Sequence, residues 1–92
     1  MTTETYAVAD DVAWLDVTEG GEVVYATTLP EGPPMVLRAT GRLIFTAAAA
    51  GGTLDVILER VGEASEMDPD TIRDEVTAFV DHLVTIGLLA RR

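Results

Sequence analysis

The sequence contains no cysteine, only one histidine and only one serine. Without cysteine the chain forms no disulfide, no thiolate metal site and no thiol nucleophile. His82 alone builds neither a histidine metal cluster nor a catalytic group supported by a second histidine. We expect His82 to be an ordinary solvent-facing residue on a helix. We find no catalytic constellation, and we therefore predict a protein that is not an enzyme and that needs no cofactor or metal.

Positive charge is also scarce. Lys and Arg together number 6 against 16 Asp and Glu, which gives a formal net charge of -10 and an isoelectric point near 4.2. Such a chain repels phosphate backbones and anionic membranes, because both are bound through basic side chains. We therefore predict no nucleic acid and no membrane as partner, and expect a partner that is neutral or basic.

Long apolar runs are missing. The longest stretch of low charge, residues 43–54, is too short to cross a bilayer. The first fifteen residues hold three acids and no base, so they do not form a signal peptide. We expect a cytoplasmic protein of one domain, residues 6–92, after a flexible N-terminal segment, residues 1–5.

Isolated polar residues have simple structural explanations. Ser65 is not followed by the leucine that usually follows the phosphopantetheine serine of an acyl carrier, so that function is excluded. The pairs Asp10-Asp11 and Asp68/Asp70 lack the glycine-centred spacing of a calcium loop. A turn for the first pair and a helix cap for the second explain these carboxylates better.

Local patterns predict the order of elements. Alternation and β-branched residues predict three strands, at residues 6–17, 22–29 and 35–39. The run Thr18-Glu19-Gly20-Gly21 predicts a hairpin turn between the first two strands. The proline-rich residues 30–34 predict a loop before the third strand.

Capping residues then predict three helices. Thr40, Thr53 and Asp68 are the expected N-caps, with Pro69 at the first position of the last helix. Gly51-Gly52 is expected to stop the first helix and Gly87 the last. The last helix carries an apolar stripe for the core, namely Ile72, Val76, Phe79, Val80 and Leu83.

This order predicts an α+β fold in which a three-stranded antiparallel sheet is followed by three helices, as in a winged helix-turn-helix domain. Many winged helices bind DNA, so a DNA-binding regulator is one alternative. Charge opposes it, because four acids on the last helix, listed next, face the single base Arg73. The acids are Asp70, Asp74, Glu75 and Asp81.

The motifs resemble those of the PqqD-like family over roughly residues 6–90. Tyr25 and the Pro30-Glu31-Gly32 loop precede the stretch Leu37-Arg38-Ala39-Thr40-Gly41, which runs into Leu43-Ile44-Phe45. Residues 53–57 resemble the start of the family's second helix, and residues 72–89 resemble its C-terminal helix with a Gly-Leu-Leu ending. Arg38 departs from the family pattern, where Asn is common.

The resemblance implies a recognition element for ribosomally made and modified peptides. Such a protein binds the leader of a precursor peptide as an added strand and delivers it to a leader peptidase, cyclase or radical enzyme. A free-standing element used with a separate peptidase, as in lasso-peptide clusters, is the preferred type. An adaptor that docks a folded enzyme and no peptide is another alternative.

The implied peptide-binding residues lie on the third strand and the last helix. Met35 and Leu37 would point into the core and Val36 and Arg38 away from it. On the helix the expected groove residues are Arg73, Thr77, Val80 and Val84, although core positions explain Val80 and Val84 equally well.

Overall fold

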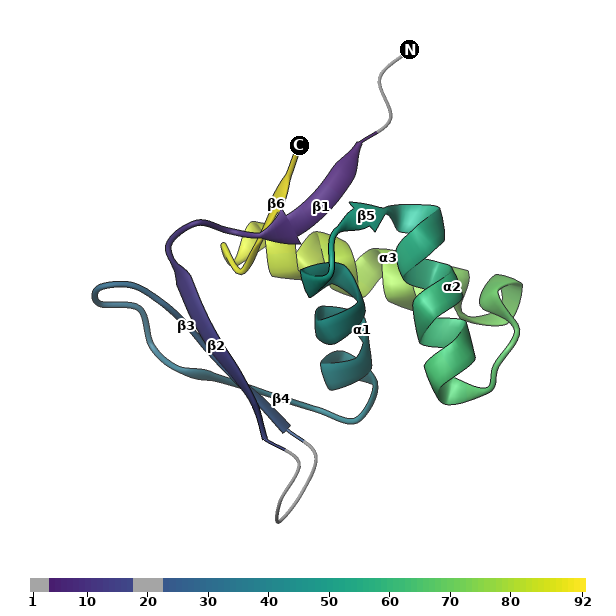
Figure 1. Ribbon diagram of the computed structural model, residues 1–92, viewed down its shortest axis with the longest axis horizontal. Coiled ribbons are helices and arrows are strands. Elements are labelled where there is room, and N and C mark those ends of the chain that lie inside the picture. The colour runs from purple at the N-terminus through teal and green to yellow at the C-terminus, as the bar shows by residue number, and fades with distance from the viewer. Residues whose placement is uncertain (1–3, 18–22) are drawn as a thin grey trace.

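The computed structural model describes residues 4–17 and 23–92 and has a mixed α/β fold with three helices and two three-stranded antiparallel sheets (Figure 1). In chain order the elements are β1 (Thr5–Val8), β2 (Val12–Val17), β3 (Val23–Thr28), β4 (Met35–Arg38), α1 (Thr40–Ala49), β5 (Gly52–Thr53), α2 (Leu54–Ser65), α3 (Pro69–Thr85) and β6 (Leu89–Arg91). The sheet β2-β3-β4 followed by three helices is as predicted. The hairpin turn expected at residues 18–21 lies outside the described residues.

The second sheet, β5-β1-β6, was not predicted. Residues 6–17 were expected to form one strand, but the chain turns at residues 9–11, where the Val12 N–H donates to the Ala9 carbonyl at 3.1 Å. The part before this turn pairs with β5 and β6 instead of β3. Thr5, which was expected to precede the first strand, belongs to β1 and exchanges two backbone hydrogen bonds with Arg92.

The C-terminal residues fold back on the core and close the second sheet. Gly87 has a φ of 87°, which lets the chain reverse after α3. Leu88 and Leu89 are buried as a result. Arg91 donates to Asp81 at 2.7 Å, and this hydrogen bond, with a smaller contribution from Tyr6, raises the pKa of Arg91.

Two of the three predicted N-caps are confirmed. The Thr53 hydroxyl accepts from the Val56 N–H at 3.3 Å, and the Asp68 carboxylate accepts from the Asp70 N–H at 2.9 Å. Pro69 occupies the first turn of α3 as expected. The expectation for Thr40 was wrong: α1 begins at Thr40 and its N-cap residue is Ala39, which has no side-chain capping bond.

Ala39 makes the sharp connection from β4 to α1. Its backbone has φ 52° and ψ -127°, a conformation that residues with a Cβ rarely adopt. Its carbonyl nevertheless accepts the first bond of the helix, from the Leu43 N–H at 3.2 Å. Ala39 is therefore the single residue between the last residue of β4 and the first residue of α1.

We expect Ala39→Gly to stabilise the protein by about 1 kcal/mol, because glycine adopts this backbone conformation without the steric cost of a Cβ. Urea unfolding measures the change. Ala64→Gly in the last turn of α2 is the control, and it should destabilise by about 0.5–1 kcal/mol because glycine disfavours helix. Equal losses for both variants would contradict strain at Ala39.

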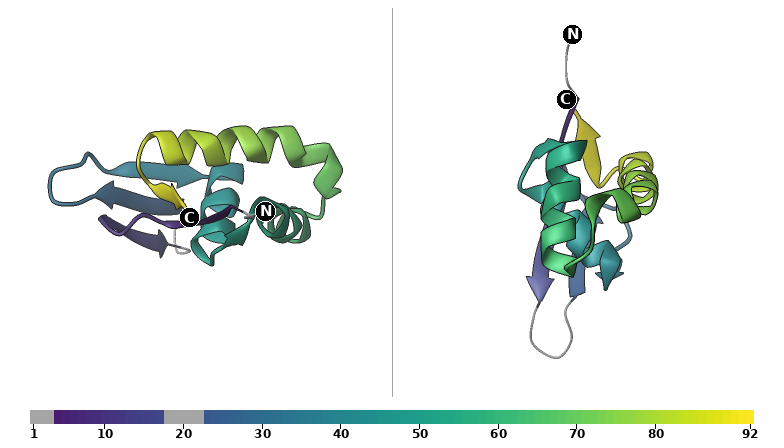
Figure 2. Two further views of the ribbon diagram at one scale, coloured as in Figure 1. Left: turned by 90° about the horizontal axis from the view of Figure 1, so that it is seen from above. Right: turned by 90° about the vertical axis from the view of Figure 1, so that its right-hand side faces the viewer.

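The core lies between one face of the sheet β2-β3-β4 and the helices (Figure 2), and the second sheet contributes Tyr6 and Leu89 to it. Val24, Ala26 and Leu37 point inward from the sheet and are buried. Phe45 of α1 is fully buried and meets the ring of Trp14 edge-on, with centroids 5.3 Å apart. An ion pair between Arg42 and Asp16 at 2.9 Å also joins α1 to β2. The sheet is thus fixed to the helices through α1.

The α3 stripe is confirmed as part of this core, to which α1 and α2 also contribute buried residues. Ile72, Val76, Val80 and Leu83 are buried, whereas Phe79 is half-buried. The exposed part of Phe79 lines a cavity between α1 and α3.

Candidate functional site

β4 is an edge strand. In the sheet order β2-β3-β4 it pairs with β3, and in the described part of the chain no strand pairs with its other side. Both views in Figure 2 show β4 as the strand of this sheet nearest α3. An open edge offers unpaired backbone N–H and C=O groups to a foreign extended segment.

The hydrogen-bond pattern of the sheet shows which β4 groups face this edge. The Leu29 N–H donates to the Asp11 carbonyl at 2.6 Å, which continues the register of β2 and β3 by one pair. Hydrogen-bonded and non-hydrogen-bonded pairs alternate in an antiparallel ladder. The residues of β3 that bond to β4 are therefore Val24 and Ala26.

Their partners on β4 are Leu37 and Met35, which direct their backbone groups toward β3. Consequently Val36, which lies between them, directs its N–H and C=O away from the sheet, as does Arg38. Val36 therefore presents a donor and an acceptor at the open edge.

The side chains of β4 alternate as predicted. Leu37 is buried and Met35 packs against the core, whereas Val36 and Arg38 are exposed. Arg38 makes no ion pair with any residue that the structure describes. It therefore offers a positive charge at the end of the edge strand.

An open cavity of about 370 Å³ follows β4, between the first turns of α1 and one flank of α3. It is lined by Thr40, Gly41, Ile44, Glu75, Ala78, Phe79 and His82. Gly41 allows the Phe79 ring to lie close to α1, because a Cβ on Gly41 would be 3.1 Å from the Phe79 Cζ atom. The cavity therefore has an apolar floor formed by Ile44 and Phe79.

Two polar side chains stand beside this floor. Glu75 and His82 are both exposed and lie two turns apart on α3. The His82 ring is tilted against the Phe79 ring, with centroids 6.1 Å apart. His82 is solvent-facing as expected, but it also forms part of a cavity that the sequence did not reveal. The cavity can accept an apolar side chain flanked by hydrogen-bonding groups.

The α3 residues predicted from the sequence lie elsewhere. None of Arg73, Thr77, Val80 and Val84 lines this cavity. Val80 is fully buried and Val84 packs against the core, so both have core positions. Arg73 forms ion pairs with Asp55 at 3.3 Å and Asp70 at 3.7 Å, which places it on the α2 side of α3.

A helix has two flanks beside its buried stripe, and Arg73, which was predicted from the sequence, lies on the flank that faces α2. Residues at positions 75, 78, 79 and 82 share the other flank through the same helical spacing. Glu75 and His82 are polar, but so are Arg73 and Thr77 among the residues predicted from the sequence, so polarity in the sequence does not distinguish the two flanks.

If the cavity receives a side chain of a bound peptide, Ala78→Trp is expected to weaken peptide binding at least about tenfold, because the indole would fill the cavity beside Phe79. Ala78 is exposed, so the free energy of unfolding should change by less than about 0.5 kcal/mol. Fluorescence anisotropy with a labelled leader peptide measures the affinity. Ala64→Trp, exposed on α2, is the matched control and should bind as the wild type. Equal affinities for the two variants would exclude the cavity from the binding site.

Other kinds of site find no support in the structure. Within residues 4–17 and 23–92, no group of three or more His, Asp or Glu side chains is placed to hold a metal ion. No helix in those ranges has the length and apolar character needed to span a membrane.

One family model matches residues 29–89, and it describes coenzyme PQQ synthesis protein D (PqqD). The matched part runs from the loop before β4 to the first residue of β6, and so includes the open edge, the cavity and all three helices. The chain belongs to the PqqD family. Proteins of the PqqD type are accessory peptide-binding proteins rather than catalysts. Comparisons with curated proteins and with solved structures give no match.

PqqD membership confirms the resemblance that the sequence motifs indicated. It supports a role in the biosynthesis of ribosomally made, modified peptides, with a peptide and a biosynthetic enzyme as the kinds of partner. The open edge of β4 and the cavity beside α3 are the features of this PqqD-family chain that fit such a peptide.

Proposed function

We propose that this PqqD-family protein binds the leader of a ribosomally synthesised precursor peptide by strand addition to β4 and presents it to a maturation enzyme. The observation that carries the proposal is the outward direction of the Val36 N–H and C=O at an unpaired edge. A leader strand there would form a fourth strand next to β4, on the side where α3 lies.

The hydrogen bonds at the edge do not by themselves give enough binding free energy for a stable complex with the leader. Hydrogen bonds to the outward groups of Val36 and Arg38 contribute about 0.5–1.5 kcal/mol each. Association and ordering of the peptide oppose this gain by several kcal/mol. An apolar leader side chain in the cavity adds about 2–3 kcal/mol if it buries about 100 Å². Edge and cavity together still fall short of the roughly 8 kcal/mol of net binding free energy that micromolar affinity requires, so we expect further contacts along the leader to contribute.

The surroundings of the edge indicate the chemistry of the leader. An apolar side chain fits the floor formed by Ile44 and Phe79, and a carboxylate fits the exposed Arg38. The rest of the leader should not be strongly acidic, because the protein has a net charge of -10.

The proposal also covers the type of fold and the enzyme that receives the leader. The sheet β2-β3-β4 would act as the wing of a winged helix-turn-helix domain. The receiving enzyme would be a leader peptidase of a lasso-peptide pathway, with a cyclase or radical enzyme as the other candidates. Nothing in the fold favours DNA, and we expect no mobility shift with duplex DNA at low salt.

Isothermal titration calorimetry tests the proposal. The titrant is the leader segment of the precursor peptide encoded in the same gene cluster, and the core segment of that precursor is the control. We expect a dissociation constant in the micromolar range or lower for the leader and no binding of the core. Absence of heat with the leader at millimolar concentration would refute the proposal.

A further inference from the structure

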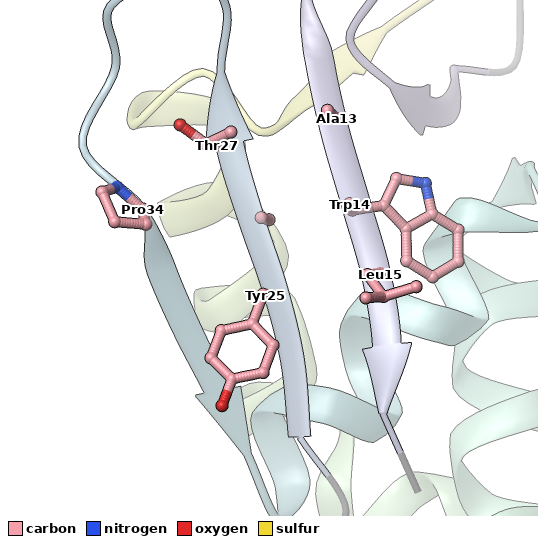
Figure 3. A pocket seen from close by; sticks show the side chains of 7 residues that line it. Ala13, Trp14, Leu15, Tyr25, Thr27 and Pro34 are labelled. Carbon is pink, nitrogen blue, oxygen red and sulfur yellow. The ribbon is translucent and has the colours of Figure 1, made fainter.

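The face of the sheet β2-β3-β4 that points away from the helices carries a row of exposed apolar side chains. Leu15, Tyr25 and Val36 are direct cross-strand neighbours on β2, β3 and β4. Their exposed fractions are 63%, 46% and 44%. Leu15 and Tyr25 also line a shallow pocket of about 220 Å³, together with Thr27 and Pro34 among others (Figure 3). We refer to Leu15, Tyr25 and Val36 as the outer row.

Charge distinguishes this face from the rest of the molecule. The strand positions that share it carry no carboxylate among the described residues, although the chain as a whole has a net charge of -10. These positions are Ala13, Leu15, Val17, Val23, Tyr25, Thr27, Val36 and Arg38. A face without carboxylates that carries large exposed apolar side chains is typical of a protein–protein contact.

The area of this face is too small to form a stable symmetric dimer. β2 and β3 have six residues each, so three strands form a face on the order of 300 Å². A stable dimer buries about 800 Å² on each partner. Two copies would also bring two chains of net charge -10 together. A transient partner with basic groups around its contact surface fits better.

The outer row continues to the edge where the leader would bind. Val36 contributes its backbone to that edge and its side chain to the outer row. A leader strand paired with β4 would extend the same pleated face, with alternate leader side chains next to Val36. A protein that docks on this face would therefore contact the outer row and the bound leader at the same time.

We propose that the outer row is the docking surface for the maturation enzyme, and that the enzyme binds the leader-loaded protein more tightly than the free protein. This inference rests on the proposed function. The enzyme surface that docks here is apolar at its centre and basic at its rim. Because the enzyme contacts both the sheet and the bound leader, it binds the leader-loaded protein more tightly than the free protein.

The experiment uses the full chain, the leader of the precursor encoded in the same gene cluster and the purified maturation enzyme of that cluster. The test variant is the double substitution Leu15→Arg and Tyr25→Arg. Both side chains lie on strands other than β4, so the leader edge stays intact. Met67→Arg is the matched control, because Met67 is 47% exposed but lies between α2 and α3.

We expect the double variant to bind the leader within twofold of wild type and the enzyme at least tenfold more weakly. The Met67→Arg variant should match wild type in both assays, and saturating leader should tighten enzyme binding by wild type at least threefold. Biolayer interferometry measures the enzyme and fluorescence anisotropy the leader.

Unchanged enzyme affinity in the double variant would overturn the docking surface. So would a wild-type dimer in sedimentation analysis that the double variant dissociates, since a second copy would then occupy the face. Failure of wild type to bind the leader would refute the proposed function instead, while the leader-free enzyme assay would still test the outer row.

Discussion

Val36→Pro is expected to weaken leader binding by about tenfold to a hundredfold. Proline removes the N–H that Val36 directs outward from β4, and the carbonyl of the leader that would accept it stays unpaired. This loss corresponds to about 1–3 kcal/mol. The pairing of β4 with β3 should persist, because Met35 and Leu37 supply those hydrogen bonds. Calorimetry with the leader peptide measures the effect.

Val36→Thr is the matched control for this variant. Threonine keeps the N–H and the branched Cβ of valine, so leader affinity should stay within about threefold of wild type. Urea unfolding of both variants shows whether the sheet is intact. A folded Val36→Pro protein that binds the leader as well as Val36→Thr does would mean that the leader does not pair with this edge.

Phe45→Ala is expected to destabilise the protein by about 3–5 kcal/mol, the usual cost of removing a buried aromatic ring. Phe45 has no exposed area and joins the helical core to the sheet through its edge-on contact with Trp14. A domain of this size is stable by only about 5–14 kcal/mol, so the loss is a large part of the total. Urea unfolding followed by circular dichroism gives the free energy of unfolding.

Tyr25→Ala removes a similar ring from the exposed face of β3, where Tyr25 is 46% exposed. We expect this control to cost no more than about 1 kcal/mol. Similar losses for Tyr25→Ala and Phe45→Ala would show that the two faces of the sheet are equally buried, contrary to the structure.

The helices could be predicted because their signals are local. Thr53, Asp68 and Pro69 act within one turn of the backbone they cap, and Gly87 acts at its own position. The Ala39 cap could not be predicted in this way. Its positive φ is imposed by the tight connection between β4 and α1, and alanine itself does not favour that conformation.

The second sheet could not be predicted because its pairing is distant in sequence. Tyr6 pairs with Gly52 and with Arg91, and no local pattern identifies either partner. β5 has only two residues and β6 three, too few for an alternation signal. Asp10-Asp11 predicts a turn, but the alternation on both sides of it predicts one continuous strand, and the structure has the turn.

The candidate site was predicted in part. Alternation assigned Met35 and Leu37 to the core and Val36 and Arg38 to the exterior, and the burial of β4 agrees. The flank of α3 that lines the cavity could not be predicted, because it depends on how α3 packs against α1 in three dimensions. The close approach of Phe79 to Gly41 shows this contact directly.

Amide hydrogen exchange at Val36, followed by NMR, tests the strand-addition account most directly. In the free protein this N–H should exchange quickly, while the Leu37 N–H, bonded to β3, exchanges slowly. At saturating leader, exchange at Val36 should slow by about a hundredfold, as for any N–H that gains a stable backbone partner. An unchanged Val36 exchange rate in a fully leader-bound protein would contradict the account.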